Sequence, residues 1–298
     1  MPVGTGGPIE IRMNEDGATR TDCAGAWGER MRQHLATAHL LPLRPGTALE
    51  DIAHNALPAM EEARGYLAEI TQDEAWLRGR TVMIVEGTPL LPFLMARRGT
   101  RVTVTTRSNR YAAFLREYAV KQRVEQSVTI LKGPFEVAAP AGPFDLVLGS
   151  AALYTPAVEP TIEGLLGITE DALHFFWPES APPQIRFLAA QWPEVHGAPY
   201  VDPPYAASLA RVLQSLGYAF TVTYTDVGEP AVYPTIGDAV ADCAARMGGV
   251  DSRGESHLRR ALRTALTMLP EGLRFRGTYR RAHIVIEAPG QSTERKSE

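Results

Sequence analysis

The chain has 298 residues, enough for one large domain or two small ones. Hydrophobic residues make up 45% and the formal net charge is −4, so the composition is globular and offers no basic field for a nucleic-acid backbone. No apolar run approaches the ~18–20 residues of a membrane-spanning helix, and Cys23 and Cys243 show no metal-binding spacing. We expect a cytoplasmic protein that acts on a small molecule, without nucleic acid, membrane or bound metal, and leave a homodimer open.

The N-terminal quarter is predicted to be helical after a flexible start. Residues 1–20 are rich in glycine and polar side chains, which is typical of a loosely packed terminus. Apolar residues recur at helical spacing over 22–40 and over 58–76. We expect residues 21–78 to form a helical cap before the sheet, in which Trp27 either anchors the first helix to the core or contacts a substrate.

The segment 80–106 is predicted to fold as strand, tight turn, helix and strand. Residues 81–85 are an apolar run of β-forming residues, Glu86-Gly87-Thr88-Pro89 breaks it, and a helical pattern over 90–98 leads to a second strand at 101–105. Ligands of open α/β sheets bind just beyond the carboxyl ends of the strands. The turn after the first strand is therefore the first place to expect a binding site.

The remaining elements alternate in the way that a parallel sheet requires. Further strands are expected at 127–131, 144–148, 174–177, 220–225 and 283–287, and further helices at 108–123, 159–166 and 204–216. Between the last two strands, residues 230–270 form a predicted insertion with helices at 235–247 and 255–269. Residues 291–298 are expected to be a disordered tail.

Two of these segments resemble motifs of class I S-adenosylmethionine-dependent methyltransferases. The run Val85-Glu86-Gly87-Thr88-Pro89-Leu90-Leu91 is similar to the family's first motif, although it has one glycine where the family usually has two or three. Phe144-Asp145-Leu146-Val147-Leu148-Gly149-Ser150 is similar to the fourth motif. The resemblance covers about residues 60–290.

This resemblance implies an α/β fold with a Rossmann-like, doubly wound and mostly parallel sheet. An antiparallel strand at its edge, an N-terminal helical cap and a late helical insertion complete the expected architecture. The cofactor-binding domain would span residues 79–290, and the cofactor would be S-adenosyl-L-methionine.

The resemblance also implies which residues would bind this cofactor. Glu86, Gly87, Thr88 and Pro89 would lie under its methionine part, with Glu86 receiving the ammonium group. Family members usually carry an acidic residue after the second strand for the ribose hydroxyls, and this chain has none there. Thr106, Ser108 or Asn109 would take that place as uncharged groups, whereas Arg107 would suit a phosphate.

Two further positions complete the predicted site. Phe135, after the third strand, would stack on the adenine. Ser150 and Tyr154, after the fourth strand, would face the transferring carbon or the amino-acid tail, and they are our catalytic candidates. Tyr154 is equally compatible with a core position.

The tetrad Asp202-Pro203-Pro204-Tyr205 is similar to the Asn/Asp-Pro-Pro-Tyr motif of amino-methylating enzymes. It does not follow the fourth strand, where that motif belongs. We therefore interpret Asp202 as the cap of the helix at 204–216. No pair of histidines has the i, i+4 spacing of a metal site.

Three functions remain open from the sequence. The first is methyl transfer to a small molecule, in line and away from water. The second uses the aminocarboxypropyl arm of the same cofactor and releases methylthioadenosine, as in enzymes that resemble nicotianamine synthases or azetidine-2-carboxylate-forming cyclases. The third is a non-catalytic binding protein that has kept the fold.

Overall fold

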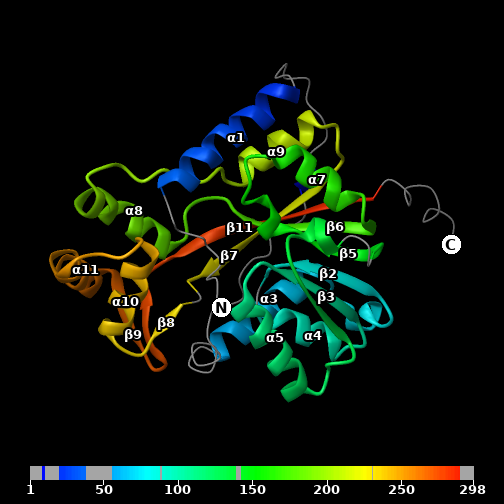
Figure 1. Ribbon diagram of the computed structural model, residues 1–298, viewed down its shortest axis with the longest axis horizontal. Helices are drawn as coiled ribbons and strands as arrows, with labels where there is room; N and C mark the ends of the chain where they lie inside the picture. Colours follow the sequence, from blue (N-terminus) through cyan, green and yellow to red (C-terminus); the bar gives the residue numbers. More distant parts are fainter. Residues whose placement is uncertain are drawn as a thin grey trace.

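A mixed sheet forms the centre of the protein in the computed structural model, which describes residues 9–10, 20–37, 56–87, 89–138, 142–229 and 231–288 (Figure 1). Its strands are β1 (Ile9–Glu10), β2 (Thr81–Val85), β3 (Arg101–Thr106), β4 (Val128–Lys132), β5 (Phe144–Leu148), β6 (Thr169–Pro178), β7 (Thr221–Gly228) and β11 (Thr278–Glu287). The predicted flexible terminus and tail lie outside the described residues, apart from positions 9, 10 and 20.

The strand order is β1-β7-β11-β6-β5-β2-β3-β4. The pairs β3–β4, β2–β3, β2–β5 and β5–β6 are parallel, which gives the order 4-3-2-5-6 of a doubly wound fold. β11 runs antiparallel between β6 and β7. The predicted Rossmann-like sheet, with an antiparallel pair of late strands at one edge, is confirmed.

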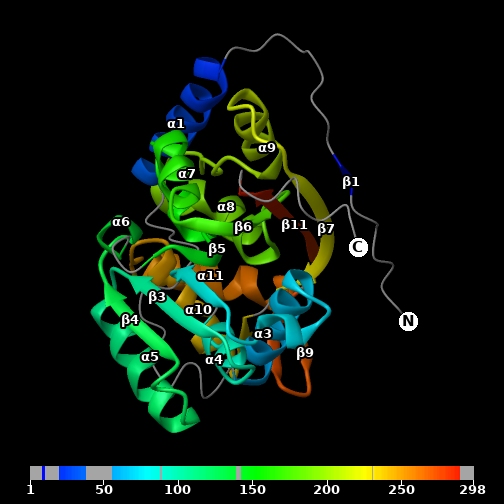
Figure 2. The ribbon, with the colours of Figure 1, turned by 90° about the vertical axis from the view of Figure 1, so that its right-hand side faces the viewer.

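Two layers of helices cover the sheet because successive residues of each strand point to opposite faces. In β2, Met83 and Val85 belong to one hydrophobic cluster, and Val82 and Ile84 belong to the other. One face carries α3 (Ala56–Ile70), α4 (Leu91–Ala96) and α5 (Asn109–Gln122), and the other carries α1 (Arg20–Thr37), α7 (Val158–Leu166) and α9 (Ala206–Ser215). Figure 2 shows the two layers below and above the strands.

The two N-terminal helices lie on opposite faces of the sheet rather than together in one cap. α1 packs against α7 and α9, whereas α3 packs against α4. Trp27 of α1 is 1% exposed and its indole N–H donates to the carbonyl of Thr155 at 3.1 Å, which fits the anchoring interpretation of this residue. The predicted second helix ends at Ile70, and Glu74–Leu77 is a separate 3-10 turn.

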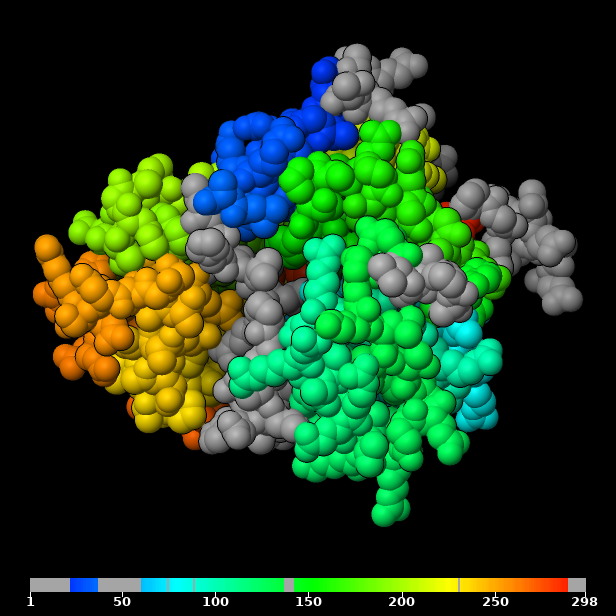
Figure 3. All heavy atoms as spheres, in the orientation of Figure 1, coloured from blue at the N-terminus to red at the C-terminus, as the bar shows by residue number. Residues whose placement is uncertain are grey.

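The late insertion forms a small unit of its own at the left of Figure 1. A three-stranded sheet of β8 (Val232–Tyr233), β9 (Leu266–Leu269) and β10 (Gly272–Phe275) packs with α8 (Pro183–His196), α10 (Ile236–Arg246) and α11 (Ser252–Ala265). Figure 3 shows α10 and α11 of this unit in yellow-orange and orange, with α8 in yellow-green above them.

Two sequence predictions in the second half of the chain were wrong, and one helix was missed. The predicted helix 255–269 ends at Ala265, because Leu266–Leu269 pairs with β10 instead. α8 was not predicted, and Pro193 in its interior interrupts the helical pattern. Asp202 does not cap α9: the residue at the N-cap is Tyr205, whose hydroxyl donates to Asp202 at 2.6 Å.

None of the helices in the described part of the chain has the length and apolar character needed to cross a bilayer.

Replacement of Gly149 should destabilise the fold, because this glycine is enclosed by core side chains. A Cβ added there would lie 2.7 Å from Leu165 Cδ1 and 3.0 Å from Phe175 Cε1. We expect Gly149→Ala to lower the free energy of unfolding by about 1–3 kcal/mol, as overpacking does, in urea titrations. Gly25→Ala in α1 is the control, because a Cβ there meets nothing within 4 Å and should be neutral or stabilising. Equal stability of the two variants would contradict this packing.

Candidate functional site

The carboxyl ends of the parallel strands meet at one edge of the sheet, which we call the carboxyl edge. The strand order reverses between β2 and β5, so this is the topological switch point at which α/β proteins bind ligands. The last pair of β5 and β6 joins Leu148 to His174, and β6 continues beyond it to Pro178. β6 is therefore longer than β5 at this edge, and there is space beside it beyond the end of β5. The turns after β2, β3 and β5 face this space.

Glu86, in the turn after β2, reaches across to the turn after β3. Its carboxylate oxygen Oε1 accepts hydrogen bonds from the backbone N–H of Arg107 at 2.8 Å and from the hydroxyl of Thr106 at 3.2 Å. Its backbone has φ 37°, a left-handed conformation that non-glycine residues rarely adopt. A carboxylate from the turn after β2 therefore lies at the end of β3.

The neighbouring Gly87 is fixed by a hydrogen bond from α5. The hydroxyl of Tyr111 donates to the Gly87 carbonyl at 3.0 Å, and burial raises the pKa of this tyrosine, which keeps the phenol neutral. A Cβ at Gly87 would lie 2.8 Å from Ile84 Cγ2, so the turn has no room for a side chain. Thr88 lies outside the described residues, and Pro89 is half-buried before α4.

The candidates for the ribose have different roles in the structure. Thr106 is buried, donates to Glu86 and accepts from the N–H of Ser108 at 3.0 Å. Ser108 caps α5, because its hydroxyl accepts from the N–H of Tyr111 at 3.1 Å. Asn109, the first residue of α5, is exposed. Of the three, Thr106 lies against the Glu86 carboxylate, and Ser108 is occupied as a helix cap.

Phe135, in the short helix α6 (Phe135–Ala138), is a correction to the predicted site. Its ring is 5% exposed and packs in the core beside α7, where Cε2 and Cζ would lie 3.3 Å from a Cβ added to Gly164. A ring held in this way has no free face for an adenine. We therefore leave Phe135 out of the proposed site.

The two catalytic candidates lie just after β5. The hydroxyl of Ser150 accepts from the backbone N–H of Phe176 at 2.8 Å, so this side chain ties the end of β5 to the extended part of β6. The half-buried Tyr154 ring lies 4.8 Å from the Trp177 ring, and burial raises the pKa of its phenol. Tyr154 is therefore protonated at neutral pH and can donate a hydrogen bond, but it cannot act as a base.

A group of charged and aromatic residues joins α3 to β11 and β6, and no sequence pattern predicts it. Glu62, Tyr66 and Glu69 lie one and two turns apart on α3, and we call them, with Arg281 of β11, the α3–β11 cluster. The Arg281 side chain is 4% exposed, donates to Glu69 at 2.6 Å and lies 3.9 Å from the Tyr66 ring centre. Residues so far apart in sequence give no local pattern that could have revealed this group.

Glu62 is the member of this cluster whose pKa is raised by burial. Burial raises its pKa to about 7, and the nearby Glu229 adds to the rise, whereas the charge of Arg281 and a hydrogen bond with Tyr66 oppose it. The residue as a whole is half-buried. A carboxyl group with a pKa near neutrality is able to take up and release protons during a reaction.

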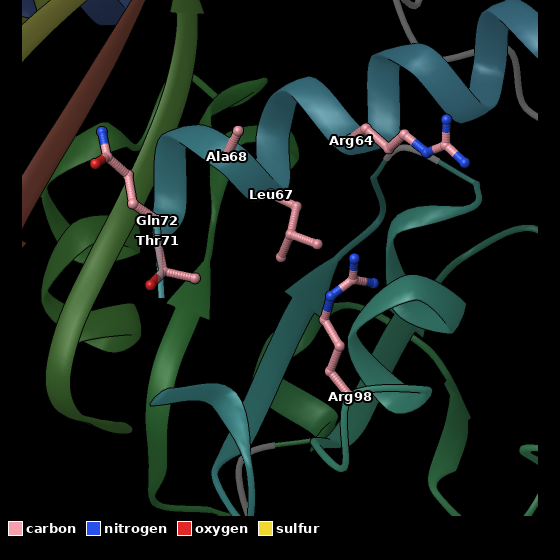
Figure 4. Close-up of a pocket in the computed structure, with 6 residues that line it drawn as sticks. All are labelled: Arg64, Leu67, Ala68, Thr71, Gln72 and Arg98. Carbon is pink, nitrogen blue, oxygen red and sulfur yellow. The ribbon is translucent and has the colours of Figure 1, made fainter. Parts of the chain in front are cut away.

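A separate cavity of about 470 Å³ lies at the opposite edge of the sheet. It is lined by Arg64, Leu67, Ala68, Thr71, Gln72 and Arg98, and Figure 4 shows Leu67 and Arg98 approaching each other from α3 and from the end of α4. α4 returns the chain from the carboxyl edge, so Arg98 lies near the start of β3, away from the turn at Glu86. No group of residues suited to a metal ion occurs among the described residues.

The raised pKa of Glu62 predicts a pH-dependent stability. The folded protein holds the Glu62 proton up to about pH 7, whereas the unfolded chain loses it near the ordinary value of 4.5. This contribution to stability is present at low pH and is lost as the pH rises through 7. We expect the melting temperature of the wild type to fall relative to that of Glu62→Gln between pH 5 and 8.

The exposed neighbour Glu61 provides the matched control for this comparison. Glu61→Gln should keep a constant offset from the wild type over the same pH range. Parallel melting curves for wild type and Glu62→Gln would show that Glu62 titrates as an ordinary surface carboxylate.

No family model and no curated protein matches this chain. Solved structures do resemble it. The YcgJ protein from Bacillus subtilis is 12% identical over 76% of this chain and 98% of its own, with a TM-score of 0.48. The [4+2]-cyclase SpnF is 14% identical over 91% and 96%, with a TM-score of 0.46. Magnesium protoporphyrin IX methyltransferase from Synechocystis PCC 6803, with bound SAH, is 11% identical over 79% and 84%, with a TM-score of 0.44.

The fold assignment comes from the strands of this chain. The parallel strands follow the order 4-3-2-5-6, and the antiparallel β11 lies between β6 and β7. The chain has a class I methyltransferase-like fold.

Proposed function

We propose that the chain binds S-adenosylmethionine at the carboxyl edge and transfers its methyl group to a small molecule. The observation that carries this proposal is the Glu86 carboxylate at the end of β3. An acidic group at that place is what the fold uses for the ribose, and the chain supplies it from the turn after β2. The closed turn at Gly87 adds a backbone surface that a ligand can approach closely.

This proposal changes the role that the sequence suggested for Glu86. The carboxylate lies against the N–H of Arg107, not beside the backbone of its own turn, so we assign it to the ribose hydroxyls instead of the ammonium group. A carboxylate accepts hydrogen bonds from hydroxyl groups more strongly than the uncharged Thr106 would. Gly87, Thr88 and Pro89 remain the proposed contacts of the methionine part.

S-Adenosylmethionine supplies a methyl group on a good leaving group, so the protein mainly has to align the two reactants and exclude water. Ser150 and Tyr154 flank the end of β5, next to the aromatic side chains of β6. We assign them to positioning: Ser150 holds the backbone at Phe176, and Tyr154 offers a phenol that donates. Neither residue supplies a base.

Removal of the Glu86 carboxylate should weaken cofactor binding. Hydrogen bonds to charged groups contribute about 1.5–3 kcal/mol, so we expect Glu86→Gln to weaken S-adenosylhomocysteine about 10–100-fold in calorimetric titrations. The exposed Glu125 provides the control, because Glu125→Gln should bind as the wild type does. Unchanged affinity of Glu86→Gln would show that this carboxylate does not contact the ligand.

A branched side chain at Gly87 should prevent binding altogether. Its Cβ would already meet Ile84, and the added methyl groups of valine would displace the turn or fill the ligand's approach. We expect Gly87→Val to show no heat with S-adenosylhomocysteine while its circular dichroism spectrum stays that of the folded protein. Wild-type affinity in this variant would place the cofactor elsewhere.

The identity of the product separates this proposal from the two alternatives. Methyl transfer yields S-adenosylhomocysteine in the presence of an acceptor, whereas use of the aminocarboxypropyl arm yields methylthioadenosine. Chromatography of the nucleoside products after incubation with S-adenosylmethionine distinguishes them. A binding protein without catalysis would release neither product.

A further inference from the structure

The hydroxyl of Tyr111 ties α5 to the turn after β2. It donates to the Gly87 carbonyl at 3.0 Å, so two elements that are separate in the fold are joined at this turn. We propose that Tyr111 is a positioning residue, which holds Gly87 in the shape that receives the amino-acid end of the methionine part of S-adenosylmethionine. This assignment rests on the proposed function, in which Gly87 contacts that part of the cofactor.

The start of α5 fixes the Tyr111 side chain. The backbone N–H of this residue donates at 3.1 Å to the hydroxyl of Ser108, which caps the helix. Tyr111 is 7% exposed, and its ring stacks on the Phe114 ring with the ring centres 6.1 Å apart. Because a closely packed ring has little room to move, its hydroxyl is a fixed point beside the turn.

The two residues of the turn are tied to different elements. Glu86 is held at the end of β3, because its N–H donates to the Thr105 carbonyl at 2.9 Å and its carboxylate accepts from the N–H of Arg107 at 2.8 Å. The Gly87 carbonyl is held by α5 through Tyr111. Loss of the Tyr111 hydroxyl therefore leaves the hydrogen bonds of Glu86 in place and removes a hydrogen bond from Gly87 alone.

Gly87 needs such a tie because glycine has no side chain to restrict its backbone. The preceding Glu86 has a left-handed backbone, with φ 37°, so ordinary local preferences do not hold the turn. A ligand that contacts the backbone of the turn binds more tightly when that backbone already has the right shape. The phenol of Tyr111 suits this role: burial raises its pKa, so it stays protonated and donates across the neutral pH range.

The test compares two ligands that share the nucleoside and the sulfur atom. S-Adenosylhomocysteine also carries the amino-acid end, which methylthioadenosine lacks. We expect Tyr111→Phe, which removes only the hydroxyl, to bind S-adenosylhomocysteine about 5–10-fold more weakly than the wild type in calorimetric titrations. Its affinity for methylthioadenosine, measured by displacement of S-adenosylhomocysteine, should stay that of the wild type.

Two further variants make the comparison specific. Tyr118→Phe removes the hydroxyl two turns further along α5, where the ring packs against Phe93 and Phe114, and it should leave both affinities unchanged. Glu86→Gln should weaken both ligands, because both contain the ribose. The methionine part and the ribose are thus probed by different residues of the same turn.

Wild-type affinity of Tyr111→Phe for S-adenosylhomocysteine would overturn the role of Tyr111. An equal loss for both ligands would also overturn it, because the hydroxyl would then support the site as a whole. A wild type that binds S-adenosylhomocysteine but not methylthioadenosine would contradict the division of the turn into a ribose side and a methionine side. Absence of S-adenosylhomocysteine binding in the wild type would instead overturn the proposed function.

Discussion

The hydrogen bond from the N–H of Arg107 to the Glu86 carboxylate fixes the geometry of the carboxyl edge. It joins the turns after β2 and β3, which the parallel pairing of these strands brings side by side. The left-handed backbone of Glu86 is a strained conformation, and the hydrogen bonds of its side chain and of its N–H to Thr105 help to hold it. Strain of this kind is typical of binding turns.

Most of the sheet could be predicted because its signals are local. Apolar runs of β-forming residues marked β2, β3 and β5, and glycines or polar caps marked the ends of the intervening helices. α8 and β9 were not predicted, because their local sequences favour other structures. Pro193 lies inside α8. Leu266–Leu269 continues the helical pattern of α11 in sequence, but it forms the strand β9, which pairs with β10.

The site was less predictable than the fold because its contacts join distant residues. The turn at Glu86 was found from the break in the strand pattern, but its contact with Arg107 depends on how two turns lie in space. Arg281 and Glu69 are 212 positions apart, and neither has a sequence neighbour that would indicate a partner. Phe135 looked available as an aromatic after a strand, and its burial against α7 depends on tertiary packing.

The end of β6 explains how both N-terminal helices reach the same site from opposite faces of the sheet. Phe176 and Trp177 are consecutive, so their side chains point to opposite faces. Trp177 meets Trp27 of α1 at 5.8 Å, and Phe176 meets Tyr66 of α3 at 4.6 Å. A substrate beyond the end of β5 would therefore lie beside a strand whose two faces are each held by one helix. Movement of either helix would change the aromatic surface at the end of β6.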